Sequence, residues 1–292
     1  MRHASDWRML AYLAIVAGVT LVQWQLDEIN PLLYAFGLFM SFTVSVISHN
    51  HNHSPIFKGR VANLLIGYVI SLFYGHPAFV WIPVHNRNHH KFVNGEGDLS
   101  ITYRLSPANN LFTLLTYPTM SSIVEMRAIG PYLRDLRSSS NRWMYWANLS
   151  QYVVFYGVMI GLFVIDWRKA LLFMLIPQQF SLFVIHIFNY VQHVNCDKDS
   201  PTNHSRNFVS PVFNALLFNN GYHTVHHDKP AAHWSETPAL HAAIAASIHP
   251  SLNVGSWWGW MFKTYLLGHP AVLPAASATT ASATAAGLPN TA

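Results

Sequence analysis

The sequence has little charge and a single cysteine. Only 10% of its 292 residues are charged and 51% are hydrophobic, whereas about a quarter of the residues in a soluble domain are usually charged. This balance excludes an ordinary soluble domain and is typical of a membrane protein. The lone Cys196 excludes an internal disulfide, a Cys-x-x-Cys metal knuckle and a dithiol redox pair. No basic run with interleaved aromatic residues occurs, so no nucleic-acid partner is expected.

Carboxylates are also scarce. The chain has 12 Asp and Glu residues against 18 histidines, so its polar chemistry must depend largely on imidazole. The Glu-x-x-His motif of soluble di-iron carboxylate proteins does not occur in the sequence. The net charge of +5 favours contact with anionic lipid headgroups or with an acidic substrate.

Four long uncharged runs are present, and each is about long enough to cross the roughly 30 Å hydrocarbon core of a bilayer. They cover residues 9–26, 31–48, 143–165 and 170–190. The first follows Arg2 and Arg8 and has no small-residue cleavage site after it, which favours an uncleaved anchor over a signal peptide. The sequence therefore predicts an all-α integral membrane protein with four transmembrane helices in two hairpins.

The positive charges set the expected orientation. Arg2 and Arg8 place the N-terminus in the cytoplasm, so each hairpin returns the chain there, and residues 49–142 and 191–269 form a cytoplasmic helical cap. Arg168 and Lys169, at the predicted outer turn of the second hairpin, run against this rule.

The run from residue 61 to 84 is uncharged too, but Gly75, His76 and Pro77 interrupt it, which favours an interfacial or re-entrant element. We expect residues 1–269 to form a single domain. Residues 270–292 are rich in Ala, Ser and Thr and are expected to be disordered.

Three histidine boxes carry the polar chemistry: "HNHNH" at residues 49–53, "HNRNHH" at 85–90 and "HTVHH" at 223–227. Residues three and four apart share a helix face, so each box can direct several imidazoles to one side. At this histidine frequency, His-x-x-His-His is expected by chance roughly 0.07 times per chain. Three such boxes, each beside an apolar run, therefore indicate a metal site.

Imidazole suits iron, zinc, copper and nickel, and one zinc typically takes four ligands, so a larger set indicates two metals. Asn189 and His193 lie four apart at the end of the last apolar run and can face the same centre. The predicted ligands are His49, His53, His85, His89, His90, His193, His223, His226 and His227. Helical spacing turns His51 about 160° away from His49, so His51 is a bystander or an outer partner.

Several other residues have candidate roles. Asp98 and Asp228, near the second and third boxes, can accept the second N–H of a bound imidazole, although both can also be solvated loop acids. Asn189 is a candidate partner of the centre. Arg87 and Lys91 flank the second box and can meet a phosphate or carboxylate headgroup. The remaining histidines, such as His76, His186 and His249, are expected to have packing, capping or surface roles.

The chain resembles the membrane fatty acid desaturase family from about residue 35 to 245. The boxes and their order carry the resemblance, together with "HNRNHHKFVNGEGD" and "NNGYHTVHHDKPAAHWSETPAL". It implies a four-span enzyme with a cytoplasmic centre of two iron ions, which uses O2 as co-substrate and two electrons to desaturate an acyl chain. The Asn189 and His193 pair matches the family's Asn-x-x-x-His element.

Two departures refine this expectation. No cytochrome b5-like segment is visible, so electrons are expected from a separate ferredoxin or reductase-type protein. The first box has three residues between its outer histidines, not the four often seen in acyl-CoA Δ9 desaturases. The acyl carrier, whether lipid, carrier protein or CoA, stays open, and a bacterial inner membrane is favoured over the endoplasmic reticulum.

Other functions remain open at this point. Related histidine boxes occur in hydroxylases of alkanes and sterols, so a hydroxylase or acetylenase with the same centre is the main alternative. A b-type haem protein would place its histidine pairs inside the spans, whereas these boxes lie at span ends. A zinc-dependent membrane hydrolase or receptor would bind about one zinc and no iron.

Overall fold

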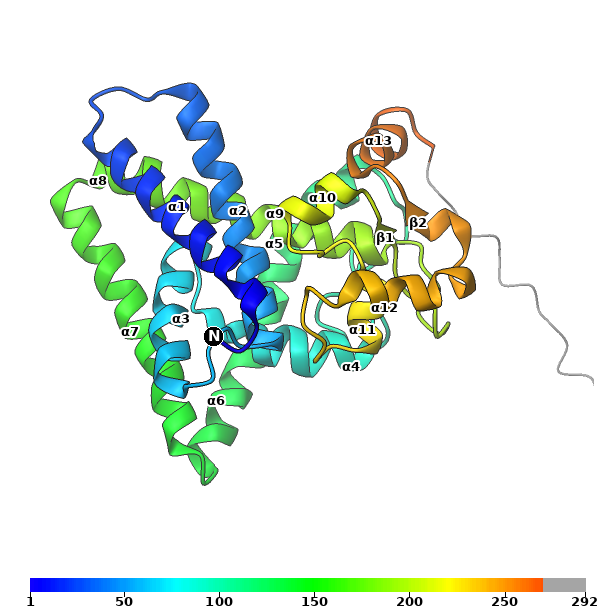
Figure 1. Cartoon of the computed structure of the whole chain (residues 1–292), viewed down its shortest axis with the longest axis horizontal. Helices are drawn as coiled ribbons and strands as arrows, with labels where there is room; N and C mark the ends of the chain where they lie inside the picture. The colour runs from blue at the N-terminus through cyan, green and yellow to red at the C-terminus, as the bar shows by residue number, and fades with distance from the viewer. Residues whose placement is uncertain (270–292) are drawn as a thin grey trace, which may run out of the picture.

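The computed structural model describes residues 1–269, and the predicted disordered tail lies outside this part. The described chain is almost entirely helical (Figure 1). Its two strands, β1 (Asn207–Phe208) and β2 (Asn253–Val254), pair in parallel as a short ribbon. The predicted all-α class is thus confirmed.

Within residues 1–269, four helices are long and apolar enough to cross a membrane, as predicted. They are α1 (Trp7–Gln25), α2 (Pro31–His53), α7 (Arg142–Ile165), and a stretch that continues from α8 (Trp167–Ala170) through a π-helical turn (Leu171–Leu175) into α9 (Ile176–His193). Both α2 and α9 continue past the predicted span ends at residues 48 and 190. The first box and His193 therefore lie on the last turns of these two helices.

The two hairpin turns lie side by side. Lys169 Nζ donates to the carbonyl oxygen of Trp24 at 2.6 Å, and the Tyr34 hydroxyl donates to that of Leu172 at 3.0 Å. Both hairpins therefore turn at the same end of the bundle, and their other ends lead into the polar parts of the chain (Figure 1).

Small polar residues let α2 and α9 approach closely. Ser41 Oγ donates to the carbonyl oxygen of Pro177 at 3.0 Å, and Ser181 Oγ donates to that of Ser41 at 2.9 Å. In apolar surroundings, serines of this kind join helices by hydrogen bonds and leave room for the backbones to pack. This contact fixes the relative position of the two helices that end at the first box and at His193.

The interrupted run forms a sharp bend. Helix α3 (Arg60–Tyr74) ends at Gly75, which has φ +96° and whose Cβ, if present, would lie 2.6 Å from Gln178 Cβ. A 3-10 turn (Ala78–Val80) and a π-helix (Ile82–His89) with α4 (His90–Phe92) follow at 91° to α3. The break expected at residues 75–77 is thus present, and it carries the second box sideways toward the first.

Most of the remaining elements form a cap over the ends of α2 and α9 (Figure 1). Helix α5 (Leu111–Glu125) packs on α9 through Tyr117, Ile187 and Tyr190. The cap consists of α5, α10 (Pro211–Leu216), α11 (His223–Asp228), α12 (Thr237–Ile244) and α13 (Trp257–Met261). Helix α6 (Ile129–Ser138) packs against the start of α7.

Candidate metal centre

The structure brings all nine predicted histidines together in two groups. Within each group, one nitrogen of every imidazole lies within 4.8 Å of the others. The five-histidine group contains His49, His53, His85, His90 and His226, and the four-histidine group contains His89, His193, His223 and His227. The second and third boxes each contribute to both groups, so the sequence boxes and the spatial groups differ.

In the five-histidine group, the Nε2 atoms converge on one point. His49 Nε2 lies 2.9 Å from His85 Nε2 and 3.0 Å from His226 Nε2. His90 Nε2 lies 3.1 Å and 3.0 Å from the same two atoms. The Nε2 of His53 is buried and has no hydrogen-bond partner in residues 1–269.

The Nε2 atoms of the four-histidine group also converge on one point. His193 Nε2 lies 3.0 Å from His89 Nε2 and 2.8 Å from His223 Nε2, and the latter is 3.2 Å from His227 Nε2. The two groups touch, because the rings of His90 and His227 stack with centroids 4.4 Å apart. They therefore form one candidate dinuclear centre.

These distances fit bound metal ions. Nitrogens about 2.0–2.1 Å from one ion are separated by about 2.9–3.4 Å in octahedral and tetrahedral arrangements. Burial, followed by the neighbouring histidines, lowers the pKa of His223, His226 and His227 well below 6.5. Neutral rings with inward nitrogen lone pairs are the donors that iron, zinc and copper accept.

The π-helix explains how the second box serves both groups. Its hydrogen bonds run from residue i to i+5, so each turn holds more residues than an α-helical turn, and residues five apart differ less in direction than they would on an α-helix. His85 and His90 accordingly reach the five-histidine group, while His89 reaches the other. The prediction that every box is helical holds, but an ordinary α-helix was the wrong geometry for this one.

The end of α9 holds His193 in place. The buried guanidinium of Arg206 donates to the carbonyl oxygens of Val191 and Val194, at the end of the helix where carbonyl groups lose their intrahelical partners. His193 Nδ1 lies 3.2 Å from the carbonyl oxygen of His204. A proton on Nδ1 satisfies this contact and leaves Nε2 free for a metal.

A tight turn presents the third box. Gly221 N–H donates to Asn214 Oδ1 at 3.0 Å, and a Cβ on Gly221 would meet the Phe208 carbonyl oxygen at 2.1 Å. Asn207 then accepts a hydrogen bond from the Thr224 N–H at 2.9 Å. These contacts fix α11, which carries His223, against the β1 strand.

Asp98 lies against the four-histidine group. Its Oδ2 is 2.8 Å from His89 Nδ1 and accepts from the Asn94 N–H at 2.7 Å, and its Oδ1 accepts from the Ser100 N–H at 2.7 Å. Burial raises the pKa of Asp98, but His89 and the hydrogen bonds outweigh this and lower it. The carboxylate therefore lies where it can accept the Nδ1–H of His89 and orient its ring.

The other predicted partners lie elsewhere. Asp228 Oδ1 is 3.4 Å from His204 Nε2, so the carboxylate is directed to a histidine outside both groups. His51 also lies outside both groups, and its Nδ1 accepts from the Ile56 N–H at 3.4 Å. The Asn189 amide donates to the Tyr117 hydroxyl at 2.6 Å.

The candidate headgroup residues are exposed and contact aromatic rings. The guanidinium of Arg87 lies 4.8 Å from the centroid of the Tyr132 ring, and the ammonium of Lys91 lies 5.0 Å from that of Phe92.

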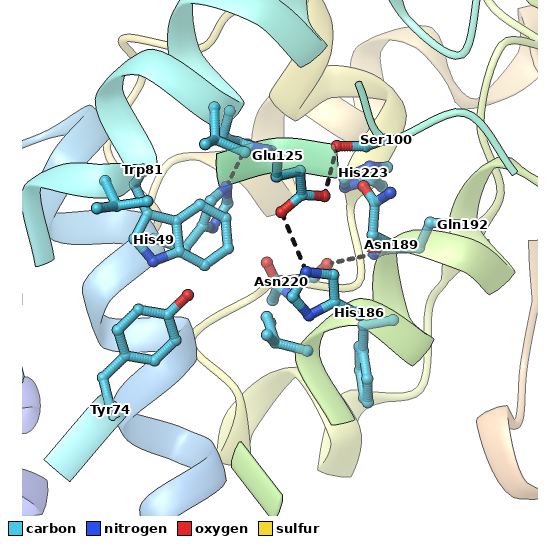
Figure 2. A pocket seen from close by; sticks show the side chains of 15 residues that line it. His49, Tyr74, Trp81, Ser100, Glu125, His186, Asn189, Gln192, Asn220 and His223 are labelled. Atoms are coloured by element: carbon cyan, nitrogen blue, oxygen red, sulfur yellow. Dashed lines mark hydrogen bonds and ion pairs between the residues drawn. The ribbon is translucent and has the colours of Figure 1, made fainter. Parts of the chain in front are cut away.

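A pocket that is partly open to solvent, with about 600 Å³ of empty space, adjoins both groups (Figure 2). His49, His85 and His223 form its metal-facing side. The rest of the lining is Tyr74, Val80, Trp81, Val84, Ser100, Glu125, Ile185, His186, Phe188, Asn189, Gln192 and Asn220.

The sequence reasoning missed one polar pair in this pocket. Glu125 was not singled out, and His186 was expected to have a packing, capping or surface role, yet Glu125 Oε2 lies 3.1 Å from His186 Nε2. An ionisable residue within an apolar run was the available signal, since His186 interrupts the uncharged span 170–190.

The candidate membrane helices and the two imidazole groups define a multi-pass membrane protein with a histidine-rich site that could hold two metal ions. The family model for fatty acid desaturase matches residues 29–268, and the chain therefore belongs to this family, as its boxes predict. The family's enzymes are metal-dependent oxidoreductases of the desaturase and hydroxylase type. A comparison with curated proteins gives no match.

Proposed function

We propose that the protein is an O2-dependent fatty acid desaturase whose nine histidines hold two iron ions. The observation that carries this proposal is the convergence of nine imidazoles, in two touching groups, beside a pocket that adjoins both groups. Two irons bound there would supply the oxidising power, drawn from O2 and two external electrons, that removing hydrogen from an unactivated methylene requires.

The chain's own residues position the substrate. Trp81, Ile185 and Phe188 provide an apolar wall on which an acyl chain can lie and from which it displaces water. The metal-facing side of the pocket then holds one carbon–carbon bond of the chain toward the histidines. The histidines act as ligands only, because their neutral rings are turned inward to the centre.

Residues 1–269 act as one domain in this proposal, with residues 49–142 and 191–269 on the cytoplasmic side of a bacterial inner membrane. The adjacent hairpin turns support a shared orientation of both hairpins. A cytoplasmic centre is accessible to a ferredoxin or reductase-type donor. The acyl chain can reach the pocket as a lipid, on a carrier protein or on CoA.

The test combines metal analysis with product analysis. The wild-type protein should purify with about two irons, and its expression in a competent host should give unsaturated acyl chains in gas chromatography of total lipids. His226→Ala should lose both, while His249→Ala should lose neither, because His249 only caps a short turn. About one zinc and no iron per chain would overturn the proposal.

A hydroxylase with the same centre is distinguished by labelled oxygen, and an acetylenase by the triple bond in its product. Hydroxylation retains one atom of 18O2 in the product, whereas desaturation and acetylene formation release both oxygen atoms as water. A product that carries 18O would assign the centre to hydroxylation instead.

A further inference from the structure

An acid–imidazole pair forms part of the pocket wall and belongs to neither histidine group. The side chains of Glu125 and His186 are 14% and 10% exposed, and they meet at 3.1 Å, Oε2 to Nε2. Figure 2 shows the pair on the pocket wall beside Asn189. His186 lies inside a candidate membrane helix, where ionisable groups are costly and usually functional.

The pair has spare acceptor capacity and no spare donor. His186 uses both ring nitrogens, since Nδ1 lies 2.7 Å from the Leu182 carbonyl oxygen and Nε2 faces Glu125. Ser100 Oγ donates to Glu125 Oε1 at 2.8 Å. A carboxylate offers about four lone-pair sites, so about two remain for a ligand.

Burial raises the pKa of Glu125, but His186 and Ser100 outweigh this and lower it. The group facing the pocket is therefore a charged carboxylate. Hydrogen bonds to such an acceptor are stronger than bonds between neutral groups.

Two amides extend this polar wall. Asn189 donates to the Tyr117 hydroxyl, and Gln192 Nε2 donates to the Asn220 carbonyl oxygen at 3.0 Å. Both residues line the pocket, and within residues 1–269 their amide oxygens accept no hydrogen bond. These groups thus present several acceptors to the pocket, and a ligand that satisfies them must bring a donor.

A plain acyl segment cannot satisfy these groups, because displacing their water leaves buried acceptors without partners. We propose that the pocket takes an apolar chain that carries a hydroxyl group, whose O–H donates to the Glu125 carboxylate. The chain lies against Trp81 and Phe188, beside the histidines. This inference rests on the proposed function in one respect, because the bound chain is the substrate of the proposed desaturase.

The test measures binding without turnover, so its outcome does not depend on whether the enzyme desaturates. The full chain, purified with its metal into lipid nanodiscs, is kept under argon without an electron donor. A tritiated hexadecanol is the bound probe, and its displacement by unlabelled competitors gives their affinities. The competitors are hexadecanols with the hydroxyl at carbon 1, 4 or 8, the methyl ethers of these alcohols, and hexadecane. All concentrations are expressed per lipid molecule. The methyl ethers keep an oxygen acceptor but lack the donor.

At least one alcohol should bind roughly ten- to hundredfold tighter than its methyl ether and than hexadecane. Glu125→Gln should reduce this ratio to about twofold while hexadecane affinity is retained. Glu28→Gln, an exposed acid in the first hairpin turn, should behave as wild type.

Two results would overturn the proposal. The first is that the wild-type protein binds no alcohol more tightly than the methyl ether of that alcohol. This result does not depend on the folding of any variant. The second is an equal loss of affinity for alcohols, ethers and hexadecane in Glu125→Gln, which identifies the pair as a clamp between α5 and α9 only. Absence of iron or of any oxidised product would instead count against the proposed function and leave this measurement intact.

Discussion

At the scale of single residues, the direction of each ring separates ligand candidates from bystanders. His49 and His53 face the five-histidine group from one side of α2, whereas His51, between them, turns to the Ile56 N–H. The spacing of four along a helix is sufficient for this distinction. The same spacing does not show that Asp98, and not Asp228, lies against a candidate ligand, because that depends on how distant loops fold.

Replacing the middle histidine should leave the metal in place. We expect His51→Ala to keep about two irons per chain and His49→Ala to lose at least one, because only His49 has Nε2 in a group. Iron is counted by mass spectrometry of the purified proteins. Equal loss in both variants would contradict the helical interpretation of this box.

Removing the carboxylate behind His89 should weaken one metal selectively. Asp98→Asn is expected to lower metal affinity of the four-histidine group about 10–100-fold, since partners of this kind orient the bound ring. Titration with metal and chelator should show one weakened site and one unchanged site. Asp135→Asn, at an exposed position on α6, is the matched control; two unchanged sites in Asp98→Asn would refute this role.

At the scale of elements, irregular backbone delivers the histidines. The π-helix divides the second box between the groups, the bend after α3 carries that box sideways, and the turn at Gly221 sets the start of α11. These features depend on contacts with other elements, such as Gln178 beside Gly75. Regular hydrophobic periodicity carries no signal for them.

The turn before α11 should not tolerate a side chain. We expect Gly221→Ala to lower the free energy of unfolding by about 1–3 kcal/mol, because a Cβ there overlaps the Phe208 carbonyl oxygen. The variant should also bind less metal, since the turn positions His223. A Cβ at position 255 would have no neighbouring atom within 4 Å, so Gly255→Ala is the control. Thermal unfolding in detergent gives the comparison, and similar midpoints for the two variants would argue against a tight turn.

At the scale of the whole molecule, two adjacent hairpins and a cap enclose the centre. Residues from four distant parts of the chain meet there, and most of their rings are buried. The adjacent hairpin turns imply that both hairpins enter the membrane from the side of the cap. The orientation of the protein in the membrane and the effect of acid on its stability therefore both depend on how the whole fold is assembled.

Cysteine labelling should reveal the orientation. In a Cys196→Ser background, Asp27→Cys in the first hairpin turn should react with a membrane-impermeant maleimide added to intact spheroplasts. Ser140→Cys, exposed just before α7, should react only after the membrane is permeabilised. Labelling of both from the outside would exclude the proposed arrangement.

Acid should destabilise the metal-free protein. Burial lowers the pKa of His223, His226 and His227 from the ordinary 6.5 in the folded chain. As the pH falls through about 6.5, the unfolded chain therefore binds more protons than the folded chain, and the free energy of unfolding decreases. Well above this pH both states are neutral at these histidines, which then leave the free energy of unfolding unchanged. Unfolding midpoints of the metal-stripped protein should fall between pH 7.5 and 5.5. A constant midpoint over this interval would contradict neutral, buried rings.

The sequence by itself determined the membrane class, the four long apolar helices and the nine inward histidines, because composition and i, i+4 spacing are local properties. Only the tertiary structure decided how these histidines divide into two groups and which carboxylate supports them. It alone brought Glu125 on α5 to His186 on α9, at a distance of 61 positions along the chain. Such pairings depend on helix packing and on irregular turns, which hydrogen bonds between remote residues fix and which no local pattern encodes.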